Sequence, residues 1–372
     1  MTKMSLETTT TETTTFHMAA PSFPSQREFQ QSMSMERGSE ISRNESFIYA
    51  NTTYRYRYST KLFSKSFPIF QDDVGATTLP SVVYGVCANA GKPVRRHAIR
   101  KSWGREVPVY FLVAGHWDSI STEFLRFGDL LWVDVPEDYR NALTPKTFAF
   151  LHFASLYAIP GLSHPVSSAN HPPLFEYMFK TDDDVYINAT EMSRELLVHK
   201  HPDYYGLLRK DTAPIRNNTE IGLVSKWYMS KEEYPYDVFP PYAHGTGYAL
   251  STTFGMCATQ AMATTRYYMP WEDVATGMLA EACGVTLAPS DSEWSHFLPF
   301  DSPESEWMEF PYHRFQDGHV PVKILHKVKP WFFEPLSRQA SLVKAREYGG
   351  QKWAETRRRR EARAELRKRP DG

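Results

Sequence analysis

From residue 79 onward, short apolar runs alternate with stretches of helical pattern. The strand-like runs are residues 81–88, 107–113 and 129–135, and the helical stretches are residues 97–103 and 145–159. Strands that alternate with helices in this way pack as a mostly parallel sheet with helices on both faces. We therefore expect an α/β fold with a Rossmann-like central sheet.

A further strand-like run, residues 177–181, ends in three adjacent aspartates, Asp182, Asp183 and Asp184. Strands are depleted in Asp and adjacent carboxylates repel, so this cluster indicates a bound cation. Carboxylate oxygens suit Mg²⁺ or Mn²⁺, which often share a phosphate-bearing ligand, and open α/β sheets bind ligands at the carboxyl ends of their strands. The run indicates a metal-assisted enzyme acting on a nucleotide or sugar phosphate. Taken alone, it fits an acidic turn that caps the next helix equally well.

Composition divides the chain of 372 residues into three parts. Residues 1–76 are rich in Thr, Ser, Met and Gln without periodicity, which predicts a disordered, stem-like leader. Residues 77–335 hold the apolar pattern of one folded domain, and residues 336–372 form a basic, Arg-rich tail that is helical or disordered. The formal net charge of −1 gives no overall attraction to nucleic acid, so we expect no nucleic-acid partner.

Cysteines and hydropathy limit the chain further. The three cysteines, Cys87, Cys257 and Cys283, have no CxxC spacing, so we expect no structural zinc and at most one disulfide. Asn-x-Ser/Thr sequons begin at Asn44, Asn51, Asn188 and Asn217, a pattern that suits a secretory protein. No apolar run approaches the roughly 18 residues of a membrane-spanning helix, and no cleaved signal peptide is visible.

Two segments offer groups that complement a nucleotide. Residues 94–104 read as a basic helix in which Arg96 and Arg100, four apart, could grip a diphosphate; a solvated basic face is the alternative. Residues 239–251 contain two glycines and two prolines before an apolar run, a turn that lets the backbone approach a ligand closely.

A third segment, residues 270–284, begins a helix with Glu272 and Asp273 in its first turn. Carboxylates at this position ordinarily compensate the helix dipole. One of them could instead act as a general base, if it faces the ligand.

In their order along the chain, these segments resemble the family 31 glycosyltransferases, the inverting β-1,3-galactosyl- and β-1,3-N-acetylglucosaminyltransferases. The resemblance is carried by residues 95–104, 141–147, 180–186, 226–230, 234–251 and 272–274. It implies a GT-A fold, a UDP-galactose or UDP-N-acetylglucosamine donor, and Mn²⁺ (alternatively Mg²⁺) on the diphosphate. It also implies a location in the Golgi lumen and membrane association, although the chain shows no anchor.

The resemblance also implies residue roles. Asp184 would ligate the metal, Asp182 would lie near the metal and the donor ribose, and Asp183 would steer the metal site. A late histidine would complete the metal shell: His326 is our choice, with His319 and His313 as rivals. The groups expected on the donor are Arg96, Arg100, Lys180, Asp182 and Asp183.

Asp273 is our choice of base, with a pKa lowered by the helix N-terminus. The acceptor side would comprise Trp227, Tyr242, His244, Gly245, Gly247 and Glu272. The acceptor would be a glycan, free or on a glycoprotein or glycolipid.

The chain departs from the family pattern at residues 243–247, where Ala-His-Gly-Thr-Gly replaces Cys-Ser-Gly-Gly-Gly. A disulfide often made by that cysteine is therefore absent, and acceptor choice could differ. Galactose is the favoured sugar. The alternatives are an N-acetylglucosaminyltransferase, a non-catalytic relative that binds sugar nucleotide or glycan, and a metal-dependent phosphohydrolase or nucleotidyltransferase.

Overall fold

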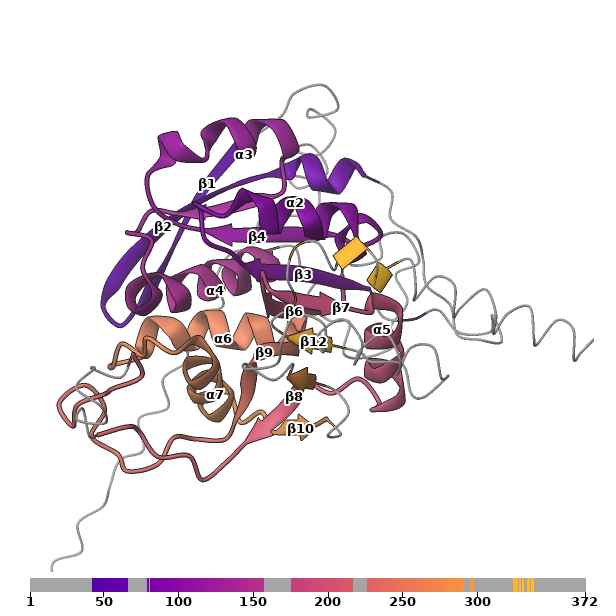
Figure 1. Ribbon diagram of the computed structural model, residues 1–372. Helices are drawn as coiled ribbons and strands as arrows, with labels where there is room; N and C mark the ends of the chain where they lie inside the picture. Colours follow the sequence, from indigo (N-terminus) through magenta and orange to yellow (C-terminus); the bar gives the residue numbers. More distant parts are fainter. Residues whose placement is uncertain are drawn as a thin grey trace, which may run out of the picture. The chain divides into compact units, whose positions relative to one another are not determined.

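A nine-stranded sheet carries the fold, in the order β1-β2-β5-β4-β3-β6-β9-β8-β10 (Figure 1). Its strands are β1 (Ser42–Tyr49), β2 (Thr52–Ser59), β3 (Val82–Cys87), β4 (Val109–Val113), β5 (Leu130–Val133), β6 (Tyr177–Asp182), β8 (Tyr204–Arg209), β9 (Tyr242–Ser251) and β10 (Leu287–Pro289). A second sheet consists of β11 (Ser295–Phe297), β12 (Ile324–His326) and β7 (Val185–Ile187). The computed structural model describes residues 42–65, 79, 81–156, 175–216, 226–290, 295–297, 324–326, 328, 330, 333–334 and 336–337.

The centre of the large sheet is parallel. Strands β5, β4, β3 and β6 run in one direction, and within this described sheet only β2 and β9 run against it. Every residue of β3 and β4 is buried, as expected for strands covered on both faces. The strands expected at 81–88, 107–113, 129–135 and 177–181 are confirmed, and so is the α/β fold with a mostly parallel central sheet.

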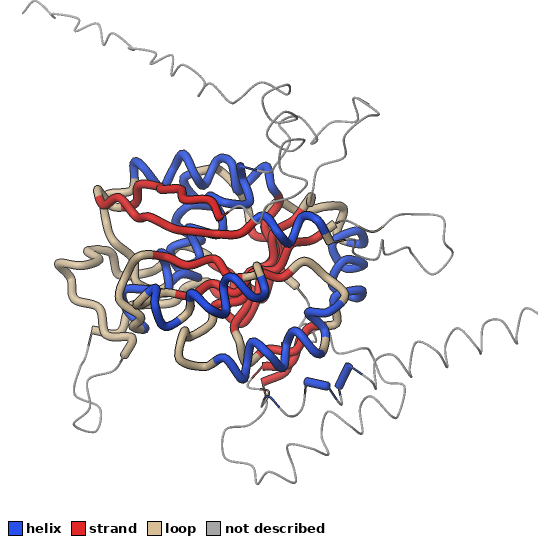
Figure 2. The backbone as a smooth tube through the Cα atoms, turned by 90° about the horizontal axis from the view of Figure 1, so that it is seen from above, coloured by secondary structure: helices blue, strands red, loops and turns tan. Residues whose placement is uncertain are grey.

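Helices cover both faces of the sheet (Figure 2). They are α2 (Pro93–Lys101), α3 (Ser121–Phe127), α4 (Tyr139–Leu156), α5 (Ala189–Val198), α6 (Thr252–Thr264) and α7 (Glu272–Ala282), with short 3-10 helices η1 (Thr60–Ser64), η2 (Trp103–Arg105) and η3 (Trp117–Ser119). Two hydrophobic clusters divide the side chains of β4: Tyr110 and Leu112 pack with α4, α6 and α7, while Phe111 packs with α2, α3 and α5. Because successive strand residues point to opposite faces, these clusters are the two layers of the core.

The hairpin of β1 and β2 shows that the expectation of no fold in residues 1–76 is wrong for residues 42–64. Ala50 and Asn51 form its two-residue turn with φ of 47° and 60°, a conformation that hairpins favour and Asn tolerates. In β2, Tyr56 and Tyr58 are buried while Arg55 is exposed. Residues 1–41 of the expected leader, and nearly all of the tail, lie outside the described residues.

Helix α4 begins at Tyr139, six residues before the expected start, and carries Pro145 in its interior. A proline at this position cannot donate a hydrogen bond to the carbonyl of Asn141, four residues earlier. The hydroxyl of Tyr268 donates to that carbonyl instead, at 3.1 Å, so the helix continues through the proline. Neither α4 nor another helix of the described residues has the length and hydropathy needed to cross a membrane.

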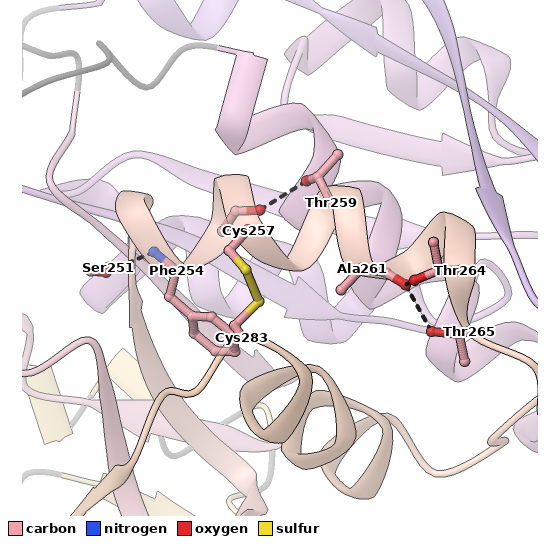
Figure 3. Close-up of a disulfide and its surroundings, with 9 residues drawn as sticks. Ser251, Phe254, Cys257, Thr259, Ala261, Thr264, Thr265 and Cys283 are labelled. Carbon is pink, nitrogen blue, oxygen red and sulfur yellow. Dashed lines mark hydrogen bonds between the residues drawn. A yellow bond between two sulfur atoms is a disulfide. The ribbon is translucent and has the colours of Figure 1, made fainter. Parts of the chain in front are cut away.

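One disulfide links the two helices that follow β9. Cys257 of α6 is bonded to Cys283, which directly follows α7 (Figure 3). The third cysteine, Cys87, is buried and free. The bridge therefore fastens the end of α7 opposite to Glu272 and Asp273.

Candidate active site

The three aspartates follow the expected strand: Asp182 ends β6, and Asp183 and Asp184 form the turn to β7. Strand β12 pairs with β7 and places His326 opposite Val185. The Nε2 atom of His326 lies 3.6 Å from Oδ1 of Asp184. One ligand atom each of Asp182, Asp184 and His326 lies within 4.8 Å of the others. The structure thus brings together the three residues expected to hold the metal.

This cluster has the chemistry of a site for a hard divalent cation. Burial and the charge of Asp182 raise the pKa of Asp184 to about 6; Arg95 opposes this shift, and Asp183 adds to it. A cation would relieve the excess of negative charge. Two carboxylates and one imidazole leave coordination positions for phosphate oxygens, which suits Mn²⁺ or Mg²⁺. His313 and His319 lie outside the described residues.

Arg95 is the cation of the basic helix that reaches the aspartates, and the sequence reasoning missed it. Its Nη1 atom lies 2.5 Å from Oδ1 of Asp183 and 3.7 Å from Oδ2 of Asp184. The side chain stays 28% exposed, whereas Asp183 is buried. Arg95 can therefore bind Asp183 and still face a ligand.

Arg96 and Arg100 do not reach this site, contrary to the expected donor-binding role. Arg96 is 1% exposed and donates to Glu123 and to the carbonyls of Asn89 and Ala90. Arg100 donates to Asp129, which directly precedes β5 and so lies at the amino end of the parallel strands. Both guanidiniums instead fasten helix α2 to its neighbours.

Lys180 connects the metal cluster to the first turn of α7. Its buried Nζ donates to Asp182 at 2.9 Å, to the carbonyl of Gly245 at 2.7 Å, and to Glu272. Burial disfavours the ammonium, but Asp182 and Glu272 outweigh it and keep the pKa of Lys180 well above its usual range. Lys180 is thus a charged positioning group with no free face for the donor, and Glu272 is its ion-pair partner.

Asp273 lies beside this network and is partly exposed. Burial raises the pKa of its carboxyl, although hydrogen bonds from the Val274 and Gly245 backbones and the charge of Lys180 lower it. The direction is opposite to the expected lowering, because desolvation outweighs the helix N-terminus. An aspartate with a raised pKa is a stronger proton acceptor than an ordinary one.

The glycines of the 243–247 segment have different roles. A Cβ at Gly245 would lie 2.9 Å from Oε1 of Glu272 and 3.3 Å from Oδ2 of Asp273, so only glycine leaves room for both carboxylates. A Cβ at Gly247 would lie 2.9 Å from the ring of Phe179. Gly245 therefore shapes the site, while Gly247 serves the packing of β9.

His244 is the residue of β9 next to Gly245 and is half-buried. Burial, Arg209 and His326 lower the pKa of His244 to about 4. The backbone N–H of Thr246 donates to its Nδ1 at 3.2 Å, which fixes the proton of the neutral ring on Nε2. The charge of His326 is among the causes of this pKa shift, so His244 lies within electrostatic reach of the metal cluster, and its place on the acceptor side stays a prediction.

Of the residues expected on the acceptor side, Tyr242 lies within electrostatic reach of Asp273. Tyr242 is nearly buried, and after burial the charge of Asp273 is the main cause that raises its pKa. Trp227 is 49% exposed and has Lys226 over its ring. Lys226 and its other aromatic neighbour, Tyr139, were not predicted to be site residues. Lys226 begins the 226–230 segment of the family resemblance, and Tyr139 lies two residues before the 141–147 segment.

The segment at 141–147 contributes indirectly. Lys146 is buried and donates to the carbonyl of Ala88 at 3.1 Å and to Glu137 at 2.8 Å. Glu137 in turn accepts from the backbone N–H groups of Ala90 and Ala114. These bonds hold the loops that follow β3 and β4, at the ligand-binding edge of the sheet.

In sequence, the chain is similar to known galactosyltransferases. Residues 94–291, more than half of the chain, match the family model for galactosyltransferase. A β-1,3-galactosyltransferase 5 of Pan paniscus is 28% identical over 270 residues, and the match covers 66% of this chain and 82% of that protein. A β-1,3-galactosyltransferase 4 of Rattus norvegicus is 30% identical over 257 residues, 58% of this chain and 63% of that protein. A solved galactosyltransferase with donor and acceptor sugar analogues covers 71% of this chain and 95% of its own, at 12% identity and a TM-score of 0.31.

Proposed function

The chain belongs to glycosyltransferase family 31, the galactosyltransferase family, and from that membership we propose that it is an inverting β-1,3-glycosyltransferase with a UDP-sugar donor. The sugar is galactose, with N-acetylglucosamine as the competing choice, and the acceptor is a hydroxyl of a glycan in protein glycosylation. One observation carries the proposal: the cluster of Asp182, Asp184 and His326 is joined through Lys180 to the helix end that bears Asp273.

The donor is expected at the metal cluster. Asp182, Asp184 and His326 would hold Mn²⁺, or Mg²⁺ in its place, which when bound offsets the charge of the diphosphate. Arg95 adds a positive charge beside Asp183 and Asp184, and it is exposed enough to meet a phosphate oxygen. These groups favour a diphosphate leaving group.

In the transfer step, Asp273 acts as the general base. The acceptor hydroxyl passes its proton to the Asp273 carboxylate while its oxygen bonds to the anomeric carbon of the donor. The bond from that carbon to the diphosphate oxygen breaks, and UDP leaves with the electron pair. Attack on the side opposite to the leaving group inverts the anomeric configuration. The raised pKa of Asp273 favours proton acceptance, whereas Glu272 is held by Lys180.

We place the reaction in the Golgi lumen, on the acceptor groups of secretory glycoproteins or glycolipids. The disulfide between Cys257 and Cys283 supports an oxidising compartment. We also propose that the protein is associated with the Golgi membrane.

Release of UDP by the purified full chain tests the proposal. The assay compares UDP-galactose, UDP-N-acetylglucosamine and UDP-glucose, with β-linked galactosides, N-acetylglucosaminides and N-acetylgalactosaminides as acceptors, in Mn²⁺ or in chelator. We expect release with UDP-galactose only, lost in chelator and in Asp184→Ala. Asp118→Ala, which removes an exposed carboxylate of η3, is the matched control and should keep full activity.

Other outcomes identify the alternatives. Release with UDP-N-acetylglucosamine alone would keep the transferase and change its sugar. Metal-dependent UDP binding without release from any donor would indicate a non-catalytic relative. Free phosphate or pyrophosphate as the product would indicate a phosphohydrolase or a nucleotidyltransferase instead of a glycosyltransferase.

A further inference from the structure

Two exposed aromatic rings hold a lysine between them beside the active site. Tyr139, the first residue of α4, and Trp227 are each 49% exposed. The Nζ atom of Lys226 lies 4.6 Å from the ring centroid of Tyr139 and 4.4 Å from that of Trp227. Lys226 is exposed, and the faces of both rings attract its ammonium group. We refer to Tyr139, Lys226 and Trp227 as the aromatic platform.

The platform adjoins the helix end that carries the proposed base. The ring of Tyr139 lies 6.1 Å from that of Trp271, which directly precedes Glu272 and Asp273. Burial is the main cause that raises the pKa of Tyr139, and the charges of Glu272, Asp182 and Asp273 raise it further. The ring is therefore within electrostatic reach of the carboxylates.

The platform is also firmly held. Arg140, the next residue of α4, donates from Nη1 to the carbonyl of Tyr228 at 2.9 Å and joins the Lys226–Trp227 segment to the helix. The hydroxyl of Tyr268 shares its proton between the carbonyl of Arg140, at 3.0 Å, and that of Asn141, at 3.1 Å. Two large rings that are exposed yet fixed keep apolar area in water, which usually marks a binding surface.

We propose that the aromatic platform is the subsite for the acceptor sugar: a β-linked pyranose lies with its apolar C–H face on Tyr139 and Trp227, and Lys226 donates hydrogen bonds to its hydroxyls. This inference rests on the proposed function and adds its acceptor site. The donor diphosphate belongs at the metal cluster, while the acceptor hydroxyl must reach Asp273. The platform adjoins Asp273 through Trp271, so it suits the acceptor.

Acceptor kinetics and acceptor binding test the platform separately from turnover. Tyr139→Ala and Trp227→Ala should each raise the acceptor KM by roughly tenfold or more, since aromatic anchors dominate such sites. Both should leave metal-dependent UDP binding unchanged, because the nucleotide belongs at the metal cluster. Tyr139→Phe keeps the ring and should retain acceptor KM, and Lys226→Met should raise it several-fold. Lys101→Met, at the end of α2, is the control for loss of an exposed charge.

Binding of methyl β-galactoside, methyl β-N-acetylglucosaminide and methyl β-N-acetylgalactosaminide, measured by ligand-observed NMR, needs no catalysis. Saturation transfer to one of these glycosides that disappears in Trp227→Ala supports the platform even if the wild-type protein releases no UDP. An unchanged acceptor KM in both alanine variants, with retained thermal melting, overturns it. Loss of metal-dependent UDP binding would also overturn it and assign the rings to the nucleotide.

Discussion

At the scale of single residues, Glu272 and Asp273 show how two adjacent carboxylates take different roles. Lys180 donates to Glu272, whereas Asp273 accepts from backbone N–H groups and remains partly exposed. We expect Asp273→Asn to lower kcat by about 10²–10⁴-fold, because the amide cannot accept the proton. UDP affinity should be unchanged.

Steady-state kinetics and calorimetric UDP binding check this prediction for Asp273. Glu281→Gln, an exposed carboxylate on the same helix, should behave as the wild type. Full turnover in Asp273→Asn would assign the base elsewhere.

The arginines of α2 give a second prediction at this scale. Arg95→Ala should raise the donor KM by about tenfold, since it removes a charged contact beside the metal cluster. Arg96→Ala should instead lower the free energy of unfolding by about 1–3 kcal/mol, because the carbonyls of Asn89 and Ala90 lose a buried donor while Glu123 keeps Arg100.

Donor kinetics and urea unfolding separate these effects. Arg105→Ala, 71% exposed and paired only at the surface, is the control for both assays. A donor defect in a stable Arg96→Ala protein would restore the role first expected for that residue.

Some of the site residues could be predicted from the sequence, and others could not. Asp182 and Asp184 stand out by residue type, because strands are depleted in Asp, whereas residue type alone makes Asp273 an ordinary helix cap and only the family resemblance makes it the choice of base. Arg95 could not be chosen over Arg96, since one step along a helix turns the side chain by about 100° and only tertiary packing decides which face meets the sheet.

At the scale of elements, the β1–β2 hairpin was missed because composition outweighed pattern. The Thr- and Ser-rich surroundings suggest disorder, yet Tyr54, Tyr56 and Tyr58 alternate with arginines at the period of a strand. The alternation identifies a strand only once its pairing partner is known. Tyr56 pairs with Val133 of β5, which joins the hairpin to the large sheet.

The disulfide is the second feature at this scale, and it yields a prediction. Cys257 and Cys283 are 26 residues apart, so the bridge should contribute about 3 kcal/mol by restricting the unfolded chain. We expect the double variant Cys257→Ser, Cys283→Ser to lose this much in urea unfolding.

The wild-type protein unfolded in reductant should match the double variant, which provides the control. Transfer activity under folding conditions should persist, because the bridge lies at the end of α7 away from Asp273. Equal stability with and without reductant would contradict the prediction.

At the scale of the whole molecule, strand order could not be predicted although strand positions could. Four strands were expected in the right places, and β3, β4 and β5 pair in chain order, but β3 also pairs with β6 and β5 with β2, each from a distant part of the chain. His326 reaches Asp184 because β12 pairs with β7, across more than a hundred residues. Such long-range pairing leaves no local signal, and the family resemblance alone favoured His326 over its rivals.

The contact between the hairpin and α4 should make the stability of the whole molecule depend on pH. His152 of α4 packs against the rings of Phe47 and Tyr56, and its Nδ1 lies 2.8 Å from the Tyr56 hydroxyl. Burial lowers the pKa of His152 from 6.5 to about 4. Between these two pH values the unfolded chain binds a proton that the folded protein does not. The contribution of His152 to stability should therefore fall by about 2–3 kcal/mol as the pH drops from 6.5 to 4.

Chemical unfolding across this pH range tests the assignment with His152→Gln, whose amide can still bond to Tyr56 but does not titrate. The variant should lose less stability than the wild type between pH 6.5 and 4. His244 has the same lowered pKa, and Asp184 and Glu272, whose pKa values are raised, act in the opposite direction. All three are common to both proteins, so the difference between the two pH profiles isolates His152. The exposed His97→Gln should leave the profile unchanged, and parallel profiles for wild type and His152→Gln would show that the hairpin contact tolerates a charged imidazole.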